Sequence, residues 1–237
     1  MAILCNHGFY TNMIFNIITT QPDIYDSFLN TSLIARGIEK DIIKINPINL
    51  YDFAIDKHRS IDDTPYGGGP GMVLRVDIID KALSTLKRKT KNEKRKTILL
   101  TPQGKGFNQK MAKRLSKQKE LILISGRFEG YDERIRNLVD EEISIGDYIL
   151  TSGDLPAQVI IDAVSRHLTG FIQEKESITT ESFEENLLEY PQYTRPARYK
   201  GKRVPEVLLS GNHAEIRAWR KKEARERTQK KRPDLLV

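Results

Sequence analysis

The apolar and polar positions between residues 13 and 168 predict strands separated by helices. Short apolar runs are typical of buried strands, and longer stretches with an apolar residue every third or fourth position are typical of helices. The predicted strands are Met13–Thr19, Ile42–Ile45, Thr97–Thr101 and Leu121–Ser125. The predicted helices are a segment that begins at Pro22, then Val76–Leu86, Asn108–Ser116 and Pro156–Leu168. Strands that alternate with helices indicate an α/β fold with a mostly parallel sheet.

The helix predicted over Pro156–Leu168 has the clearest amphipathic pattern. Its proline stands at the first position, where the missing N–H costs no hydrogen bond. Arg166 lies off the apolar stripe near the last turn, where it can point towards a ligand; an ion pair with Asp162, four residues earlier, is the alternative. The stripe consists of Ala157, Ile160, Ile161, Val164 and Leu168.

Two glycine-containing turns make residues 125–154 the most informative stretch of the chain. Glycine lets a ligand approach the backbone closely and adopts positive φ without strain. Open α/β sheets bind ligands in the turns that follow their strands. We therefore expect the turns Ser125–Gly130 and Ser144–Gly153 to form a pocket for a small nucleoside-type cofactor. Two ordinary strand-to-helix turns are the alternative interpretation.

Other glycines and prolines mark breaks in the pattern. Residues 50–71 are a predicted loop, because their glycines and prolines suit neither a helix nor a regular strand. A loop of this length in a compact domain is functional or disordered. No Gly-Lys-Ser/Thr sequence follows it, so it is not a phosphate-binding Walker loop. Pro102-Gln103-Gly104 is expected to end the strand that precedes it.

The composition is that of a globular protein without a membrane span. Of the 237 residues, 38% are apolar and 30% charged, and no run approaches 18 apolar residues. We expect no secretory signal in the first residues and a reducing, cytoplasmic location, because the chain has a single cysteine. The four histidines are scattered, so no zinc-type spacing exists and no structural metal is expected.

The charge is concentrated near the end of the chain. The net charge is +7, and residues 195–237 alone carry fourteen Lys/Arg against five Asp/Glu. A second basic block covers residues 87–96. This distribution favours a polyanionic partner, most simply nucleic acid, with an ordinary solvated lysine surface as the alternative.

These shifts in composition predict the domain organisation. Residues 1–12 precede the first periodic element and are expected to be a disordered extension. A catalytic domain over residues 13–169, a flexible acidic linker over 170–189 and a small basic helical domain over 190–237 follow. In the last of these, Asn212 is a predicted N-cap with Glu215 three residues later, and Ile216 and Trp219 are expected to face a core.

Seven motifs in order give the chain a specific resemblance. It resembles the bacterial tRNA (guanine-N1)-methyltransferase family of the SPOUT superfamily, and the resemblance covers nearly everything after residue 12. The matching segments are HRSIDDTPYGGGPGM (58–72), LTPQG (100–104), SGRFEGYDER (125–134), DEEISIGDYILTSGDLPA (140–157), DAVSR (162–166), EYPQYTRP (189–196) and LLSGNHAEIRAWR (208–220).

The resemblance implies both a fold and an activity. The fold would be a mostly parallel α/β sheet with a deep trefoil knot, a helical C-terminal domain and a homodimer in which the linker of one subunit completes the site of the other. The activity would be methylation of N1 of the guanosine 3′ of the anticodon, position 37 of tRNA, with S-adenosylmethionine as methyl donor. Mg²⁺ is a further candidate cofactor.

The same resemblance implies the site residues. The cofactor would lie bent between the turns at Leu100–Gly104, Ser125–Gly130 and Ile145–Gly153. Its contacts would be Leu100, Pro102, Gln103, Gly126, Ile145, Gly146, Asp147, Tyr148, Ile149, Leu150 and Gly153. Phe128 and Ser152 depart from the family pattern, which has tyrosine and glycine there, so the detailed cofactor geometry is expected to differ.

Methylation of guanine N1 requires a base, because that nitrogen carries a proton in the neutral nucleobase. The family uses an aspartate in the linker, and Glu181 occupies that position here; Glu184 or Glu185 is the alternative base. A carboxylate in this role contributes about 10²–10⁴-fold to the rate. Arg166 would stabilise the negative charge that develops on O6, and Glu129 would hold the guanine edge or assist Mg²⁺.

The basic domain would bind the anticodon stem-loop through phosphate contacts. The candidate residues are Arg217, Arg220, Lys221 and Arg195. Tyr193 and Trp219 are candidates for stacking on unpaired bases, with Trp219 more typical of a core position. Two other functions stay open: a SPOUT methyltransferase for another RNA site, and a non-catalytic RNA-binding protein.

Overall fold

The structure is a computed structural model that describes residues 12–89, 94–173 and 181–236. The chain divides into two compact units, Met1–Gln173 and Glu174–Val237. Residues 1–11 of the predicted N-terminal extension, residues 90–93 of the basic block and residues 174–180 of the acidic linker lie outside the described residues. In the part that is described, no helix is long and apolar enough to cross a membrane.

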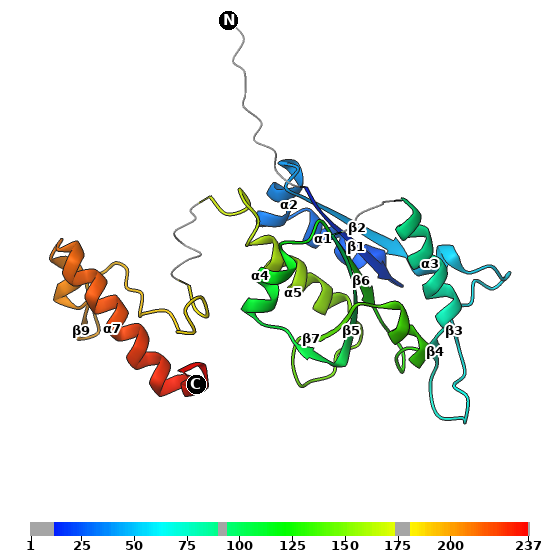
Figure 1. Cartoon of the computed structure of the whole chain (residues 1–237). Coiled ribbons are helices and arrows are strands. Elements are labelled where there is room, and N and C mark those ends of the chain that lie inside the picture. Colours follow the sequence, from blue (N-terminus) through cyan, green and yellow to red (C-terminus); the bar gives the residue numbers. More distant parts are fainter. Residues whose placement is uncertain (1–11, 90–93, 174–180, 237) are drawn as a thin grey trace, which may run out of the picture. The chain divides into compact units, whose positions relative to one another are not determined.

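A five-stranded parallel sheet forms the first unit, as predicted (Figure 1). Its strands are β1 (Met13–Thr19), β2 (Ile43–Asn49), β5 (Arg95–Gly106), β6 (Glu120–Ser125) and β7 (Glu141–Ser144). Their spatial order is β2-β1-β6-β5-β7, and every pair is parallel. All six residues of the central strand β6 are buried. Such continuous apolar runs are typical of parallel strands that are covered on both faces.

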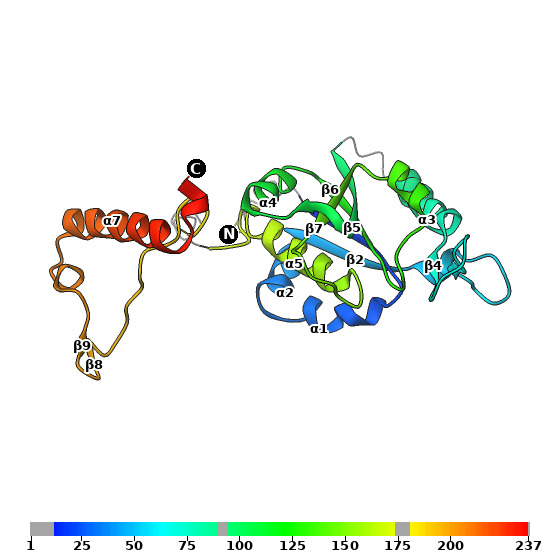
Figure 2. The ribbon, with the colours of Figure 1, turned by 90° about the horizontal axis from the view of Figure 1, so that it is seen from below.

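Helices cover the two faces of this sheet (Figures 1 and 2). Alternate residues of one strand point to opposite faces, so Leu121 joins one core cluster and Ile122 the other. The first cluster takes in η1 (Pro22–Tyr25), α1 (Asp26–Leu29), α2 (Ser32–Glu39), α4 (Gln109–Leu115) and α5 (Asp154–Ser165). The second takes in η2 (Leu50–Phe53), α3 (Val76–Lys89) and η3 (Glu133–Leu138).

Several predicted boundaries were wrong. Pro102 does not end its strand: β5 continues to Gly106, and its pairing with β7 resumes at Lys105 after a bulge. Helix α5 begins at Asp154, with Gly153 as N-cap, so Pro156 is its third residue. A proline fits there because the first four N–H groups of a helix have no partner within it. Helix α2 and strand β7, which are short, were not predicted from the sequence.

Two glycines allow chain segments to cross at backbone contact. A Cβ added to Gly104 would lie 2.6 Å from the carbonyl carbon of Glu142. One added to Gly153 would lie 2.9 Å from the Cα of Ser125. Real Cβ atoms do not approach other atoms this closely. Strands β5 and β7 are therefore in backbone contact at Gly104, and the turn after β7 lies against the end of β6 at Gly153.

Two small antiparallel sheets complete the described chain. In the first unit, β3 (Asp62–Asp63) pairs with β4 (Val73–Leu74) and brackets the glycine-rich part of the predicted loop. In the second unit, β8 (Arg198–Tyr199) and β9 (Lys202–Arg203) form a hairpin.

The second unit is built around one long helix, α7 (His213–Lys231), with η4 (Glu206–Leu209) before it and η5 (Pro233–Leu236) after it. The Asn212 side chain accepts from the backbone N–H groups of Ala214 and Glu215, which confirms the predicted cap. Ile216 and Trp219 are half-buried, while Arg217, Arg220 and Lys221 are exposed.

Candidate functional site

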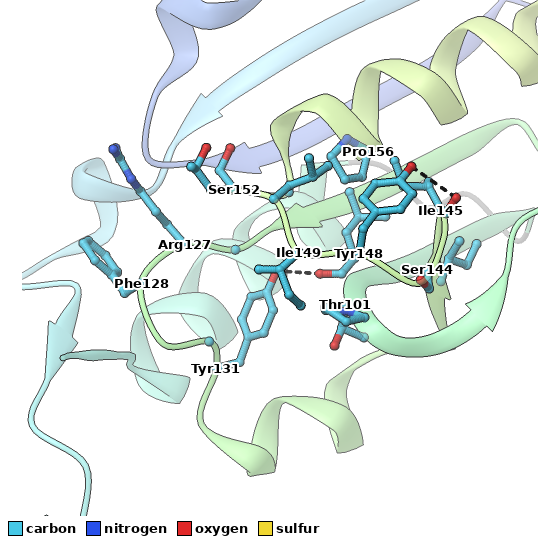
Figure 3. Close-up of a pocket in the computed structure, with 18 of the residues that line it drawn as sticks. Thr101, Arg127, Phe128, Tyr131, Ser144, Ile145, Tyr148, Ile149, Ser152 and Pro156 are labelled. Atoms are coloured by element: carbon cyan, nitrogen blue, oxygen red, sulfur yellow. Dashed lines mark hydrogen bonds between the residues drawn. The ribbon is translucent and has the colours of Figure 1, made fainter. Parts of the chain in front are cut away.

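A cavity of about 330 Å³ opens beside β5, where β6 and β7 end (Figure 3). Because the strands are parallel, their carboxyl ends point to one edge of the sheet, where α/β proteins bind ligands. The lining residues are Leu100–Pro102 within β5, Gly126–Tyr131 after β6, Ile143–Gly146 and Tyr148–Gly153 at the end of β7 and after it, and Pro156 of α5. The size and the mixture of apolar side chains with a few hydroxyl groups suit a small-molecule site.

The buried carboxylate of Asp154 joins the segments behind this cavity. Its Oδ1 accepts hydrogen bonds from Thr19 Oγ1 (2.7 Å), Tyr25 Oη (2.9 Å) and Ser125 Oγ (2.7 Å). Its Oδ2 accepts from Ser152 Oγ at 2.9 Å. The carboxylate stands in the first turn of α5, where negative charge is stabilised by the helix dipole. This network fixes α5 and the turn before it against the ends of β1 and β6.

Tyr131 forms one wall and joins two of the strands. Its hydroxyl lies 3.1 Å from the carbonyl oxygens of both Leu100 and Ile124. Burial raises the pKa of the Tyr131 hydroxyl well above its usual range, and the charge of Asp154 adds to the effect. The side chain therefore stays neutral and able to donate. Gly126 has no room for a Cβ because the Tyr131 ring occupies that space.

The loop after β7 forms the opposite wall, which carries Ser144, Ile145 and Tyr148 in Figure 3. The Ser144 hydroxyl donates to the Gly146 carbonyl oxygen at 3.1 Å and accepts from the Gly146 N–H at 3.2 Å. The Tyr148 ring covers the space where a Gly146 side chain would lie, and Gly146 has a φ of +156°. Tyr148 is 54% and Ile149 79% exposed, so apolar surface stands open at the cavity mouth.

The glycine-rich loop lies against the wall formed by residues 127–130. The backbone N–H of Glu129 donates to the Met72 carbonyl oxygen at 3.0 Å. A side chain on Gly71 would overlap that of Glu129. Phe128 has a φ of +62°, which is unusual for a non-glycine residue and is found at functional sites more often than elsewhere. Two segments that the sequence motifs singled out separately therefore meet beside the cavity.

Most of the residues predicted to contact the cofactor line this cavity. Asp147 and Gln103 do not: the Gln103 amide oxygen accepts a hydrogen bond from Arg136, and this residue lines a different hollow. Several residues that line the cavity were not predicted as cofactor contacts: Thr101, Arg127, Tyr131, Ser144, Thr151, Ser152 and Pro156. For most of them, a position within the predicted turns was the only signal. Tyr131 follows the turn Ser125–Gly130, and Pro156 lies in the predicted helix.

Of the predicted catalytic residues in the first unit, Glu129 lines the cavity and Arg166 does not. Arg166 follows the last residue of α5, whereas Pro156 at the other end of the helix lines the cavity. Ten helical residues span about 15 Å, so the backbone of Arg166 lies about that far from Pro156 along the helix. Glu181 is half-buried and belongs to the second unit.

The predicted RNA-binding residues are all exposed on the second unit: Arg195, Arg217, Arg220 and Lys221. The Arg220 guanidinium carbon lies 4.8 Å above the centre of the Tyr190 ring. Among the described residues, no group of three or more His, Cys, Asp or Glu side chains could hold a metal ion.

Comparison with known proteins identifies relatives along almost the whole chain. Residues 13–237 match the family model described as tRNA (guanine-1)-methyltransferase TrmD. The proteins named tRNA (guanine-N(1)-)-methyltransferase from Dictyoglomus turgidum and Moorella thermoacetica are 49% and 50% identical, over 93% and 94% of this chain and 89% of each relative. That of Mycoplasmopsis synoviae is 50% identical over 93% of this chain and 96% of its own length.

Proposed function

The chain belongs to the tRNA (guanine-1)-methyltransferase family, and we propose that it methylates N1 of the guanosine 3′ of the anticodon in tRNA. The observation that carries this proposal is the cavity between β5 and the turns that follow β6 and β7. Residues from three of the glycine-containing segments by which the chain resembles its family line this cavity. The proposed location is the cytoplasm.

S-adenosylmethionine fits the cavity as methyl donor. Apolar side chains of Leu100, Ile145 and Leu150 would enclose the adenine, and the hydroxyl groups of Thr101 and Ser144 supply polar contacts. The backbone of Gly126, Gly146 and Gly153 would lie against the ligand, as would Pro102, Tyr148 and Ile149. The bound donor supplies a methyl group on a positively charged sulfur, which a nitrogen nucleophile can attack.

The chain offers one residue for the proton that guanine N1 loses and one for the negative charge that then develops on O6. Glu181 would take the N1 proton as general base. Arg166 would stabilise the negative charge that moves to O6, and a preorganised cation of this kind is worth several kcal/mol in a site without water. Glu129, at the cavity wall, would hold the edge of the base or assist Mg²⁺.

These residues would meet through a second copy of the chain. Arg166 lies at the far end of α5 from the cavity, about 15 Å away along the helix. We therefore propose a homodimer in which Arg166 and Glu181 of one copy complete the cavity of the other, with residues 170–189 as the linker. Closed two-fold dimers are the commonest oligomers, and their interfaces repeat each contact twice.

The trefoil knot belongs to the same proposal. The chain runs from β6 to β7 past β5, strands β5 and β7 are in backbone contact at Gly104, and the turn after β7 lies against the end of β6 at Gly153. The fold would then consist of a knotted catalytic domain over residues 13–169 and a basic tRNA-binding domain over 190–237, after an extension over 1–12.

The test is methyl transfer from radiolabelled S-adenosylmethionine to a tRNA transcript, with the product mapped by arrest of primer extension. We expect arrest at the guanosine 3′ of the anticodon and no product when that guanosine is replaced. Arrest at another nucleotide would favour a SPOUT methyltransferase with a different RNA site. Tight tRNA binding with neither S-adenosylmethionine binding in calorimetry nor product would favour a non-catalytic RNA-binding protein.

The general base is tested by Glu181→Gln, with Glu206→Gln in the exposed η4 segment as matched control. Glu181→Gln should lower the rate of methyl transfer at least 10²-fold and leave S-adenosylmethionine binding unchanged, while Glu206→Gln retains both. If Glu181→Gln stays active and Glu184→Gln or Glu185→Gln does not, the base is one of those carboxylates instead.

A further inference from the structure

We propose that a pocket in the second unit receives one unstacked nucleobase of the tRNA, while the neighbouring β8–β9 hairpin binds the adjoining phosphates. This inference rests on the proposed function, because it takes tRNA as the ligand. We call this cavity, of about 310 Å³, the Tyr190 pocket. It is lined by Tyr190–Arg195, Ala197, Val204, Leu208, Leu209, Ile216 and Arg220.

The walls of the Tyr190 pocket combine aromatic rings with a planar cation. The Arg220 guanidinium carbon lies 4.8 Å above the centre of the Tyr190 ring, a stacked cation–π arrangement. The Tyr193 ring is 48% exposed and its centre lies 6.4 Å from that of Trp219. Unpaired RNA bases stack on tyrosine rings and guanidinium planes. The pocket thus offers both kinds of surface to one planar ligand.

Apolar and polar groups in the pocket match the two parts of a nucleobase. Val204, Leu208 and Ile216 supply an apolar side that can cover a ring face. Gln192 and Thr194 supply donors and acceptors for a base edge. Sites of this size with few polar groups bind small planar ligands, and a single base is such a ligand.

A basic hairpin begins where the pocket ends. Ala197 and Val204 line the pocket, and the backbone N–H of Val204 donates to the Ala197 carbonyl oxygen at 3.0 Å. Between them lie four exposed cations, Arg198, Lys200, Lys202 and Arg203. Within the described residues, none of these four cations forms an ion pair with an acidic side chain. Phosphates on either side of a bound base would reach this hairpin, and their negative charge complements it.

The direct test uses the intact protein and RNA that differs at one base. Trp219 is the only tryptophan in the chain and lies next to Tyr193, so its fluorescence reports the Tyr190 pocket. The probes are an anticodon stem-loop and a series in which each loop nucleotide in turn is abasic. We expect binding to quench Trp219, and one abasic position other than the methylated guanosine to weaken binding about 5- to 150-fold, the range for loss of one base–aromatic stack. Equal binding of all the probes that are abasic at those other positions would overturn the proposal.

Variants separate base contact from phosphate contact. Tyr193→Ala should weaken binding of the intact stem-loop, make it indifferent to the sensitive abasic position, and leave the salt dependence unchanged. Tyr193→Phe, which keeps the ring, should bind like the unaltered protein. Lys202→Ala should reduce the salt slope by about one and weaken all probes equally. If Tyr193→Ala and Lys202→Ala have the same effect on every probe, the pocket does not hold a base.

The outcomes also separate this inference from the proposed function. Methyl transfer with no abasic effect means that the enzyme acts on tRNA without a base in the Tyr190 pocket. An abasic effect without methyl transfer means that the pocket binds RNA in a protein that is not this methyltransferase. Displacement of the stem-loop by a polyglutamate peptide but not by unlabelled single-stranded RNA would assign the pocket to an acidic protein and overturn the inference.

Discussion

Asp154→Ala tests whether one buried carboxylate holds the cavity together. Asp154 is 1% exposed, and its donors Thr19, Tyr25 and Ser125 are 0%, 0% and 3% exposed. The substitution leaves these hydroxyl groups without their acceptor in a site that water does not reach. Each buried polar group that loses its partner costs about 1–3 kcal/mol. We therefore expect the free energy of unfolding of the first unit to fall by at least about 3 kcal/mol.

Tyr25→Phe is a milder variant that removes only one of the hydrogen bonds to Asp154. It removes a single donor, and a hydrogen bond to a charged group is worth about 1.5–3 kcal/mol. In the Asp154→Ala background the same change should cost little, because the Tyr25 hydroxyl no longer has an acceptor there. The difference between the two costs is the coupling energy of a double-mutant cycle.

Circular dichroism during thermal and urea unfolding follows the helices and strands of both units, and comparison with Trp219 fluorescence isolates the transition of the first unit. For a unit of this size, about 3 kcal/mol corresponds to a midpoint about 6–12 °C lower. Trp219 fluorescence reports the second unit, whose internal contacts Asp154→Ala leaves unchanged, and serves as the internal control. A loss below about 1 kcal/mol, or the same cost of Tyr25→Phe in both backgrounds, would refute the reasoning.

Two further predictions concern packing and pH. Gly104→Ala should destabilise the first unit by about 1–3 kcal/mol, because the new methyl group meets the backbone of Glu142 and Ile143. Gly106→Ala is the control and should be nearly neutral, because its methyl group meets nothing within 4 Å. Equal urea midpoints for the two variants would contradict the close backbone contact at Gly104. Arg114 donates to both Glu141 oxygens, at 2.6 and 2.5 Å, and lowers the pKa of that carboxyl. A lowered pKa gives stability that is present above the unfolded value of about 4.3 and is lost as the pH falls through the folded value. Arg114→Gln should thus lower the free energy of unfolding by about 0.5–1 kcal/mol at pH 7, after allowance for solvent screening, and by almost nothing at pH 3. A loss that does not depend on pH would mean that the pair is not ionic.

The sequence predicted the sheet better than it predicted the ends of elements. Strand β6 could be identified because its apolar run is continuous and is buried throughout. The end of β5 could not, because Pro102 normally stops a strand and the pairing resumes only through the bulge before Lys105. The turns of the cavity were identified from their glycines. Tyr131 was not, because its role depends on two carbonyl oxygens in other segments.

Local patterns along the chain determined what depends on neighbouring residues: the buried strands, the cap at Asn212 and the excess of cations after residue 195. Only the tertiary structure decided what depends on distant ones. Asp154 meets Thr19 across 135 positions of sequence, and the Tyr131 hydroxyl meets the Leu100 carbonyl oxygen across 31. The physical reason is that hydrogen bonds and steric contacts act over a few ångströms in space, and separation along the chain does not fix that distance.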